Sequence, residues 1–138
     1  MMKKVEIQWR KTTLNSLSQE EDTWFYALSR GNALLYIGIS YDQDITKEIK
    51  QTLRAFNTST SGLSIWLGYI IEADYRRITH QIVRDIECLL IFTHQPTYNT
   101  QCMKNYTGRD NLKVKNRRCK LLRPCVKVQG GEIYYTCR

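Results

Sequence analysis

Apolar and polar residues alternate with the period of a strand within the first forty residues. Residues 5–9 place Val, Ile and Trp at every second position, which predicts a strand with one buried face. Residues 11–22 are polar and predict a loop. Residues 23–29 and 33–40 are rich in aromatic and β-branched side chains, and Arg-Gly-Asn at 30–32 separates them. Because Gly and Asn tolerate the positive φ of tight turns, the two runs predict a β-hairpin.

The next part of the chain changes to the period of a helix. Asp42 or Asp44 is suited to the N-cap, because its side chain can accept a hydrogen bond from the first helical turn. The apolar positions that follow at helical spacing are Ile45, Ile49, Leu53 and Phe56. Residues 64–72 predict a strand, and a 3.6-residue apolar stripe predicts a helix over about 74–92. This helix is expected to end before Pro96, since the residue that precedes a proline disfavours helical backbone.

The C-terminal part of the chain predicts short strands. One strand is expected near residues 112–114. Residues 124–129 and 132–135, joined by two glycines at 130–131, predict a second hairpin. The order of elements predicts a single domain over residues 1–138 of the α/β (α+β) class, with a mostly antiparallel sheet flanked by helices.

The formal charge of +8 is concentrated near the C-terminus. Residues 1–99 carry as many acidic as basic side chains, whereas residues 100–138 carry ten basic side chains and only two acidic ones. A basic hairpin interleaved with apolar residues predicts a surface that binds phosphate groups, with salt-dependent and largely sequence-independent affinity. The expected nucleic-acid-binding residues are Lys113, Lys115, Arg117, Arg118, Lys120, Arg123 and Lys127.

Two tyrosines and a glutamate occur in a pattern that is typical of one nuclease family. Tyr26 lies on the first arm of the predicted hairpin, and the second arm carries Tyr-Ile-Gly at 36–38. Glu87 follows on the second predicted helix, before Pro-Thr-Tyr-Asn at 96–99. In this order and spacing, residues 23–99 resemble the core of the GIY-YIG nucleases, and residues 100–138 would be a basic C-terminal extension. The second family motif is complete, while the first keeps only its tyrosine.

The resemblance implies a small metal-dependent endonuclease that cleaves nucleic-acid phosphodiester bonds. It implies that Tyr26 accepts the proton of the attacking water, while Tyr36 positions and polarises its neighbours. Glu87 would hold one divalent ion, Mg²⁺ or Mn²⁺, whose oxygen shell water and phosphate complete. Asn99 joins the site through its match to the family's late motif. A neutral tyrosine is a poor base, since its ordinary pKa is about 10, so nearby positive charge has to lower that pKa.

The chain departs from the family at the position of this positive charge. The family has an arginine about one turn into the first helix, and Glu48 occupies the matching position. Three nearby cations could replace it, namely Lys47, Lys50 and Arg84. If none of them does, the chain is a catalytically inactive binding or inhibitory protein that acts on nucleic acid or on a nucleic-acid-processing enzyme.

The expected partner is nucleic acid, with DNA favoured over RNA, and a protein partner is the alternative for an inactive chain. A third possibility is a basic protein-interaction module that does not bind nucleic acid. No apolar run is long enough to span a membrane, and the first residues lack the features of a signal peptide. The five cysteines include no Cys-x-x-Cys pair, and we expect them to be buried or loop thiols in a cytoplasmic protein.

Overall fold

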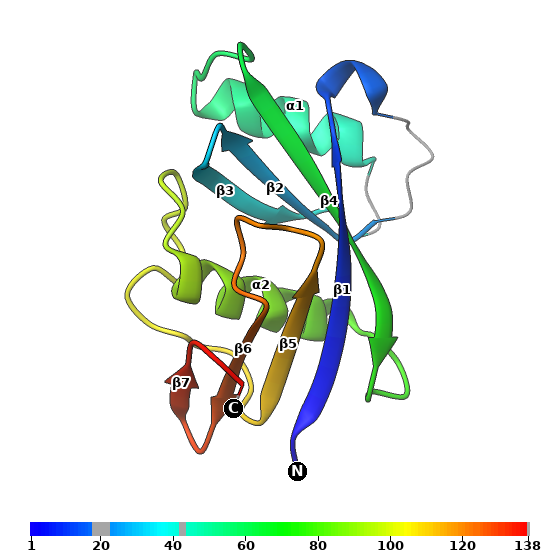
Figure 1. The fold of residues 1–138 in the computed structure, drawn as a ribbon, viewed down its shortest axis with the longest axis vertical. Coiled ribbons are helices and arrows are strands. Elements are labelled where there is room, and N and C mark those ends of the chain that lie inside the picture. The colour runs from blue at the N-terminus through cyan, green and yellow to red at the C-terminus, as the bar shows by residue number, and fades with distance from the viewer. Residues whose placement is uncertain (18–22, 42–43, 138) are drawn as a thin grey trace.

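A computed structural model describes residues 1–17, 23–41 and 44–137 and has one seven-stranded sheet with two α-helices (Figure 1). The strands are β1 (Lys3–Thr12), β2 (Phe25–Arg30), β3 (Ala33–Ile39), β4 (Leu63–Ala73), β5 (Leu112–Arg117), β6 (Cys125–Gln129) and β7 (Glu132–Tyr134). The helices are α1 (Ile45–Ala55) and α2 (His80–His94), with a short 3₁₀ turn η1 (Leu14–Ser16). The α+β class predicted from the hydrophobic pattern is confirmed.

The strand order is β3-β2-β4-β1-β5-β6-β7. Every neighbouring pair is antiparallel except β1 and β5, which are parallel and place Val5 beside Val114. The strand nearest the N-terminus therefore joins the three C-terminal strands to the β2-β3-β4 part of the sheet. The basic C-terminal residues thus belong to the same sheet as the tyrosines.

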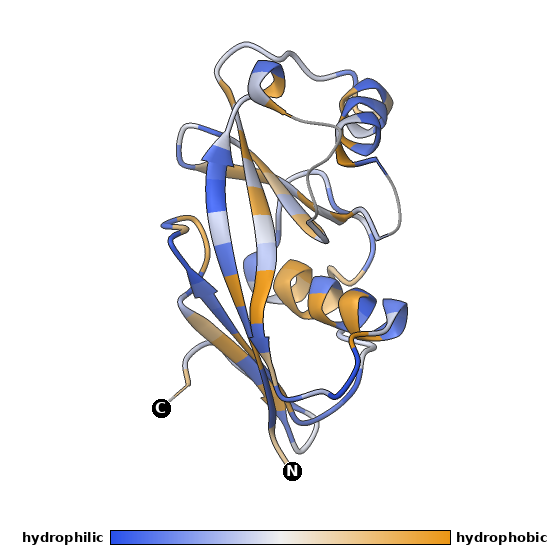
Figure 2. Cartoon of the chain, turned by 90° about the vertical axis from the view of Figure 1, so that its right-hand side faces the viewer, coloured by the Kyte–Doolittle hydropathy of each residue, from blue (hydrophilic) through white to orange (hydrophobic). Residues whose placement is uncertain are grey.

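The sheet curls around α2, which contacts β3 near one edge and β6 near the other (Figures 1 and 2). Figure 2 shows α2 as largely apolar, and its Ile86, Leu89 and Leu90 are fully buried against β1 side chains such as Ile7. Helix α1 packs on the opposite face, over β2, β3 and β4. There Ile49 joins a second buried cluster with Leu67. The successive β2 residues Phe25 and Tyr26 belong to different clusters, because strand side chains alternate between faces.

The helix starts differ in detail from those predicted. Asp44 is the N-cap of α1, and its Oδ1 accepts hydrogen bonds from the backbone nitrogens of Thr46 (2.9 Å) and Lys47 (3.4 Å). The alternative cap, Asp42, lies outside the described residues. Helix α2 begins at His80 rather than near residue 74, because Thr79 caps it by accepting a hydrogen bond from the nitrogen of Ile82 (3.2 Å).

Four of the five cysteines form disulfides, so the prediction of free thiols is wrong for them. Cys88 in α2 is bonded to Cys102, and Cys125 in β6 is bonded to Cys137, with Cα–Cα distances of 5.4 and 5.6 Å. Cys119 is a buried free thiol. The spacing of the cysteines along the chain does not predict which of them pair. The first disulfide links a loop to α2, and the second links the C-terminal segment to β6.

None of the described helices is long and apolar enough to cross a membrane.

Candidate functional site

The pairing of β2 with β3 brings the two tyrosines together. Tyr26 lies opposite Gly38 and Leu28 lies opposite Tyr36, so the two tyrosines are diagonal neighbours on one face of the sheet. Their ring centroids are 5.9 Å apart. Tyr36 also contacts Phe56, at 5.3 Å between centroids, and Phe56 stacks on Tyr98 at 5.2 Å. The contacts therefore join the β2-β3 hairpin to the segment that follows α2.

Tyr26 is fully buried and contacts α1 through its hydroxyl group. The hydroxyl donates a hydrogen bond to Oε1 of Glu48 (3.3 Å) and lies 2.8 Å from Oγ1 of Thr52. Burial raises the pKa of Tyr26 far above its ordinary value, and the Glu48 carboxylate raises it further, although the hydrogen bond with Thr52 opposes the change. The geometry therefore stabilises the neutral phenol, whereas a proton acceptor needs its pKa lowered.

Tyr36 experiences the same kind of environment. Burial raises its pKa, and the carboxylates of Glu87 and Glu48 add to the increase. Two acidic side chains thus face the two tyrosines from α2 and α1. The local field around the two tyrosines is therefore negative.

Glu87 lies on α2 beside two cavities. One, of about 160 Å³, is lined by Tyr36, Phe56 and Asn99, and the other, of about 400 Å³, by Arg84 and the Cys88–Cys102 disulfide. Burial raises the pKa of Glu87 to about 7, while Arg84 lowers it and Glu48 raises it. Near neutral pH this carboxyl group is therefore divided between its two protonation states.

We expect Glu87→Gln to stabilise the protein at pH 8 but not at pH 4.5. The folded protein holds the Glu87 proton more tightly than the unfolded chain does, so the free energy of unfolding falls as pH rises from about 4.5 to about 7. Above that range, the substitution is expected to raise the free energy of unfolding by on the order of 2 kcal/mol. Urea unfolding at both pH values measures the difference.

The matched control for this measurement is Glu72→Gln, because the Glu72 side chain is 60% exposed. It should shift stability by less than about 0.5 kcal/mol at either pH. A Glu87→Gln effect that is equal at pH 4.5 and pH 8 would contradict the raised pKa.

Asn99 is buried and bound to the backbone of β3. Its Oδ1 accepts a hydrogen bond from the nitrogen of Ile37, and its Nδ2 donates one to the oxygen of the same residue, both at 3.0 Å. The nitrogen of Tyr98 donates to the oxygen of Leu35 (2.8 Å). The side-chain amide of Asn99 therefore holds β3, and with it Tyr36, in place.

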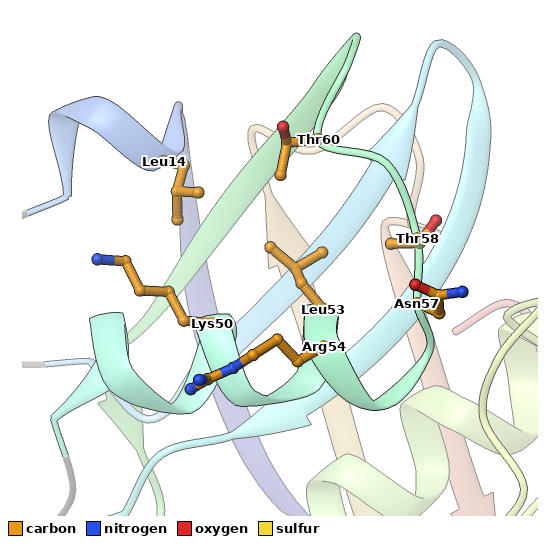
Figure 3. Close-up of a pocket in the computed structure, with 7 residues that line it drawn as sticks. All are labelled: Leu14, Lys50, Leu53, Arg54, Asn57, Thr58 and Thr60. Carbon is orange, nitrogen blue, oxygen red and sulfur yellow. The ribbon is translucent and has the colours of Figure 1, made fainter.

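The proposed cationic substitutes differ in their positions. Lys50 lies two residues after Glu48, about 200° around the helix, and so faces away from Tyr26. Figure 3 shows Lys50 and Arg54 along a groove of about 510 Å³ formed by α1, the loop after it and η1. Lys47 lines one hollow with Glu48 and Gln51, and shares another with Lys50 and Arg54. Arg84 acts on a member of the tyrosine and glutamate cluster, because it lowers the pKa of Glu87.

Sequence reasoning missed Thr52, whose hydroxyl group contacts that of Tyr26 at 2.8 Å. Its spacing of four residues from Glu48 was a usable signal, since residues one turn apart share a helix face.

The C-terminal basic residues do not lie at the tyrosines. The described residues that line the smaller cavity beside Glu87 include no lysine or arginine. Lys113, Lys115 and Arg117 instead alternate with buried residues along β5, and Lys127 does so on β6. Arg118 and Lys120 are exposed in the turn after β5, and Arg123 lies over the ring of Tyr135 at 5.1 Å.

Few carboxylate groups lie close enough to Glu87 to help bind a hard divalent ion. Among the described residues, no three His, Cys, Asp or Glu side chains form a group that could hold a metal. Glu87 and Glu48 are close enough to affect the same tyrosine. One or two carboxylates with waters and phosphate oxygens are the usual ligands of magnesium, so the types of group present are compatible with it.

No family model, no curated protein and no solved structure matches this chain.

Proposed function

We propose that this protein binds nucleic acid through the outer face of β5 and β6, and that its GIY-YIG-like cluster of tyrosines and glutamate does not cut the bound strand. The observation that carries the proposal is a group of basic side chains on the β5 and β6 part of a sheet face, beyond the part that α1 covers. We call Lys4, Lys113, Lys115, Arg117 and Lys127 the basic face.

The strand register groups the side chains of the basic face. Lys4 lies beside Lys113, and Lys113 lies beside Lys127, so three lysines follow one line across β1, β5 and β6. Lys115 is two residues farther along β5, on the same face. Helix α2 lies on the other side of these strands, and α1 packs farther along the sheet, over β2, β3 and β4 (Figures 1 and 2).

Acidic side chains neutralise part of the basic face from its β1 side, where Glu6 lies beside Lys115 in the register. Glu6 contacts Nζ of Lys4 (3.4 Å) and Nε of Arg117 (2.8 Å), and Glu72 lies 3.8 Å from Lys4. Within the described part of the chain, Lys113, Lys115 and Lys127 form no ion pair. These three ammonium groups can therefore contact phosphates without first breaking a salt bridge.

The environment of Tyr26 supports binding without cleavage. Where the family places an arginine, Glu48 accepts a hydrogen bond from the phenol and raises its pKa. A carboxylate there repels phosphate and opposes formation of a tyrosinate. Arg84 acts on Glu87 from the same helix and is not among the residues whose charges affect Tyr26 or Tyr36.

The experiment replaces Lys113, Lys115 and Lys127 together by Gln and measures affinity for labelled DNA and RNA by fluorescence anisotropy. We expect the affinity at 100 mM salt to fall by at least tenfold. The slope of log affinity against log salt should decrease by about 2 to 3, because three phosphate contacts are lost.

The matched control removes the same charge from α1 by replacing Lys47, Lys50 and Arg54 with Gln. It should reduce affinity by less than threefold. Equal losses in the two variants would mean that binding depends on net charge rather than on the basic face. Absence of binding by the unmodified protein at low salt would contradict the proposal and favour an interaction module for another partner.

Metal-dependent cleavage is the second candidate function. It is favoured by the convergence of Tyr26, Tyr36 and Glu87 from three elements, with Glu87 bordering a cavity that also contains Tyr36. A divalent ion held by Glu87 would act as a Lewis acid on the phosphate oxygens. Tyr36 would orient the substrate, and Asn99 would hold the strand that carries it.

A nuclease assay with Mg²⁺ and Mn²⁺ decides between the two candidate functions. Cleavage by the unmodified protein that is lost in Glu87→Ala would establish the second candidate and exclude binding without cutting. Absence of cleavage with either ion, together with retained binding, is the result that we expect.

The cytoplasmic location expected from the sequence stays a prediction. The two disulfides weigh against it, because such bonds persist mainly in oxidising compartments.

A further inference from the structure

Two exposed tyrosines lie at the edge of the sheet next to the basic face. Tyr134 is 40% exposed and Tyr135 is 42% exposed, which places them among the few exposed large hydrophobic residues of the described chain. Tyr134 ends β7, and Tyr135 directly follows it. Neither ring contributes to the buried clusters around α2 or α1.

Each ring has a cation over it. Nζ of Lys127 lies 5.1 Å from the centroid of Tyr134, and the guanidinium carbon of Arg123 lies 5.1 Å from the centroid of Tyr135. Attraction between a cation and the face of an aromatic ring holds both partners in position. The hydroxyl group of Tyr134 also donates a hydrogen bond to Glu132 (3.0 Å), which further fixes the ring.

The ring of Tyr134 continues the line of lysines across the sheet. Register pairs Lys113 with Lys127 and Lys127 with Tyr134, so two ammonium groups and an aromatic ring follow one another on neighbouring strands about 4.8 Å apart. The Cys125–Cys137 disulfide ties the segment after Tyr135 back to β6 and limits its movement. Cations and ring are thus held at fixed spacing.

We infer that Tyr134 and Tyr135, together with the basic face, form a binding surface for single-stranded nucleic acid. This inference rests on the proposed function and specifies its substrate class. Lysines that contact phosphates and aromatic rings on which bases stack are the two components of surfaces that bind single strands without sequence preference. Lys127 and Arg123 lie over the two tyrosine rings, so groups for phosphate contact and for base stacking are side by side.

The exposed rings distinguish a single strand from a duplex. In a duplex, the faces of the bases are stacked on one another and are not available to a protein ring. A duplex would therefore contact only the lysines, whereas a single strand would contact the lysines and the rings. Unpaired DNA and unpaired RNA offer the same chemistry, and we treat them as two sources of one ligand.

The test uses the full chain and measures anisotropy of labelled 12-nucleotide oligo-dT, oligo-U and a 12-base-pair duplex. We expect the unmodified protein to bind the single strands at least tenfold more tightly than the duplex. Replacing Tyr134 and Tyr135 by Ala should weaken single-strand binding by about tenfold or more and change duplex binding by less than twofold. A larger loss of affinity for oligo-dT than for oligo-U, or the reverse, would identify DNA or RNA as the preferred ligand.

Two control variants separate stacking from other roles of these residues. Replacing both tyrosines by Phe keeps the rings and removes the hydroxyl groups, so single-strand binding should stay within twofold of the unmodified protein. Ile71→Ala removes an apolar side chain that is 52% exposed on β4 and should leave all affinities unchanged.

Several results would overturn the inference. Equal affinity for duplex and single strand, unchanged by the Ala substitutions, would leave the proposed function intact and remove the stacking surface. Parallel losses for both ligands would show that the tyrosines only maintain the sheet edge. Displacement of the oligonucleotide by polyglutamate at equal charge concentration would show a surface that recognises charge alone. No binding to either nucleic acid would remove the inference together with the proposed function.

Discussion

Gly38→Ala is expected to lower the free energy of unfolding by about 3 kcal/mol, at the upper end of the range for overpacked cores. A Cβ atom at this position would lie 2.5 Å from Cζ and 2.6 Å from the hydroxyl oxygen of Tyr26. The ring is fully buried and its hydroxyl group contacts Thr52, so it cannot move aside without losing that contact. Urea unfolding followed by tryptophan fluorescence measures the change.

A double-mutant cycle tests whether the clash with Tyr26 is the cause. In a Tyr26→Leu background the ring is absent, and Gly38→Ala should then cost less than about 1 kcal/mol. Gly31→Ala is the control for loss of glycine itself, since Gly31 has open space around it and a φ of +59°. It should cost about 1 kcal/mol through backbone conformation alone. A similar cost of Gly38→Ala in both backgrounds would contradict the explanation.

This glycine shows what the sequence could and could not give. The Tyr-Ile-Gly tripeptide identifies Gly38 as part of the family motif, but the pairing of Gly38 with Tyr26 gives the physical reason for a glycine here. The tyrosine ring lies over the glycine, and the two residues form one unit across β2 and β3. Such a unit depends on register, which a hydrophobic pattern predicts only to the level of which face is buried.

Local signals predicted the elements better than their ends and partners. The apolar stripe predicts a helix from about residue 74, yet α2 begins at His80, because Thr79 is an effective cap. Ile78 packs against the core from outside the helix. The parallel pairing of β1 with β5 joins residues more than one hundred positions apart. No periodicity within either segment could have predicted it.

The electrostatics of the candidate site were predictable only in part. Glu48 was expected at the position of the family's arginine, and its hydrogen bond to Tyr26 shows the consequence for the phenol. The raised pKa of Glu87 depends mainly on burial, which in turn depends on how α2 and the segment after it fold against β3. Burial of one helix residue is a tertiary property, so the sequence could identify Glu87 but not its protonation behaviour.

Loss of the Cys88–Cys102 disulfide is the second large effect that we expect. The bond closes a loop with a sequence separation of 14, and closing a loop of this length contributes about 3 kcal/mol by restricting the unfolded chain. Replacing both residues by Ala should lower the free energy of unfolding by about that amount. Adding dithiothreitol to the unmodified protein should lower the free energy of unfolding by about twice this amount, because Cys125–Cys137, with a sequence separation of 12, closes a loop of nearly the same length.

A thiol titration tests directly whether both disulfides are formed. In denaturant without reductant, one thiol per chain should react, that of Cys119, out of five cysteines. Five reactive thiols would contradict both disulfides and restore the thiol interpretation of the sequence.

The Cys88–Cys102 bond also holds residues 101 and 102 in the wall of the cavity that Glu87 borders. The doubly substituted variant should therefore open that wall to water and lower the pKa of Glu87, because burial is the main cause of its increase.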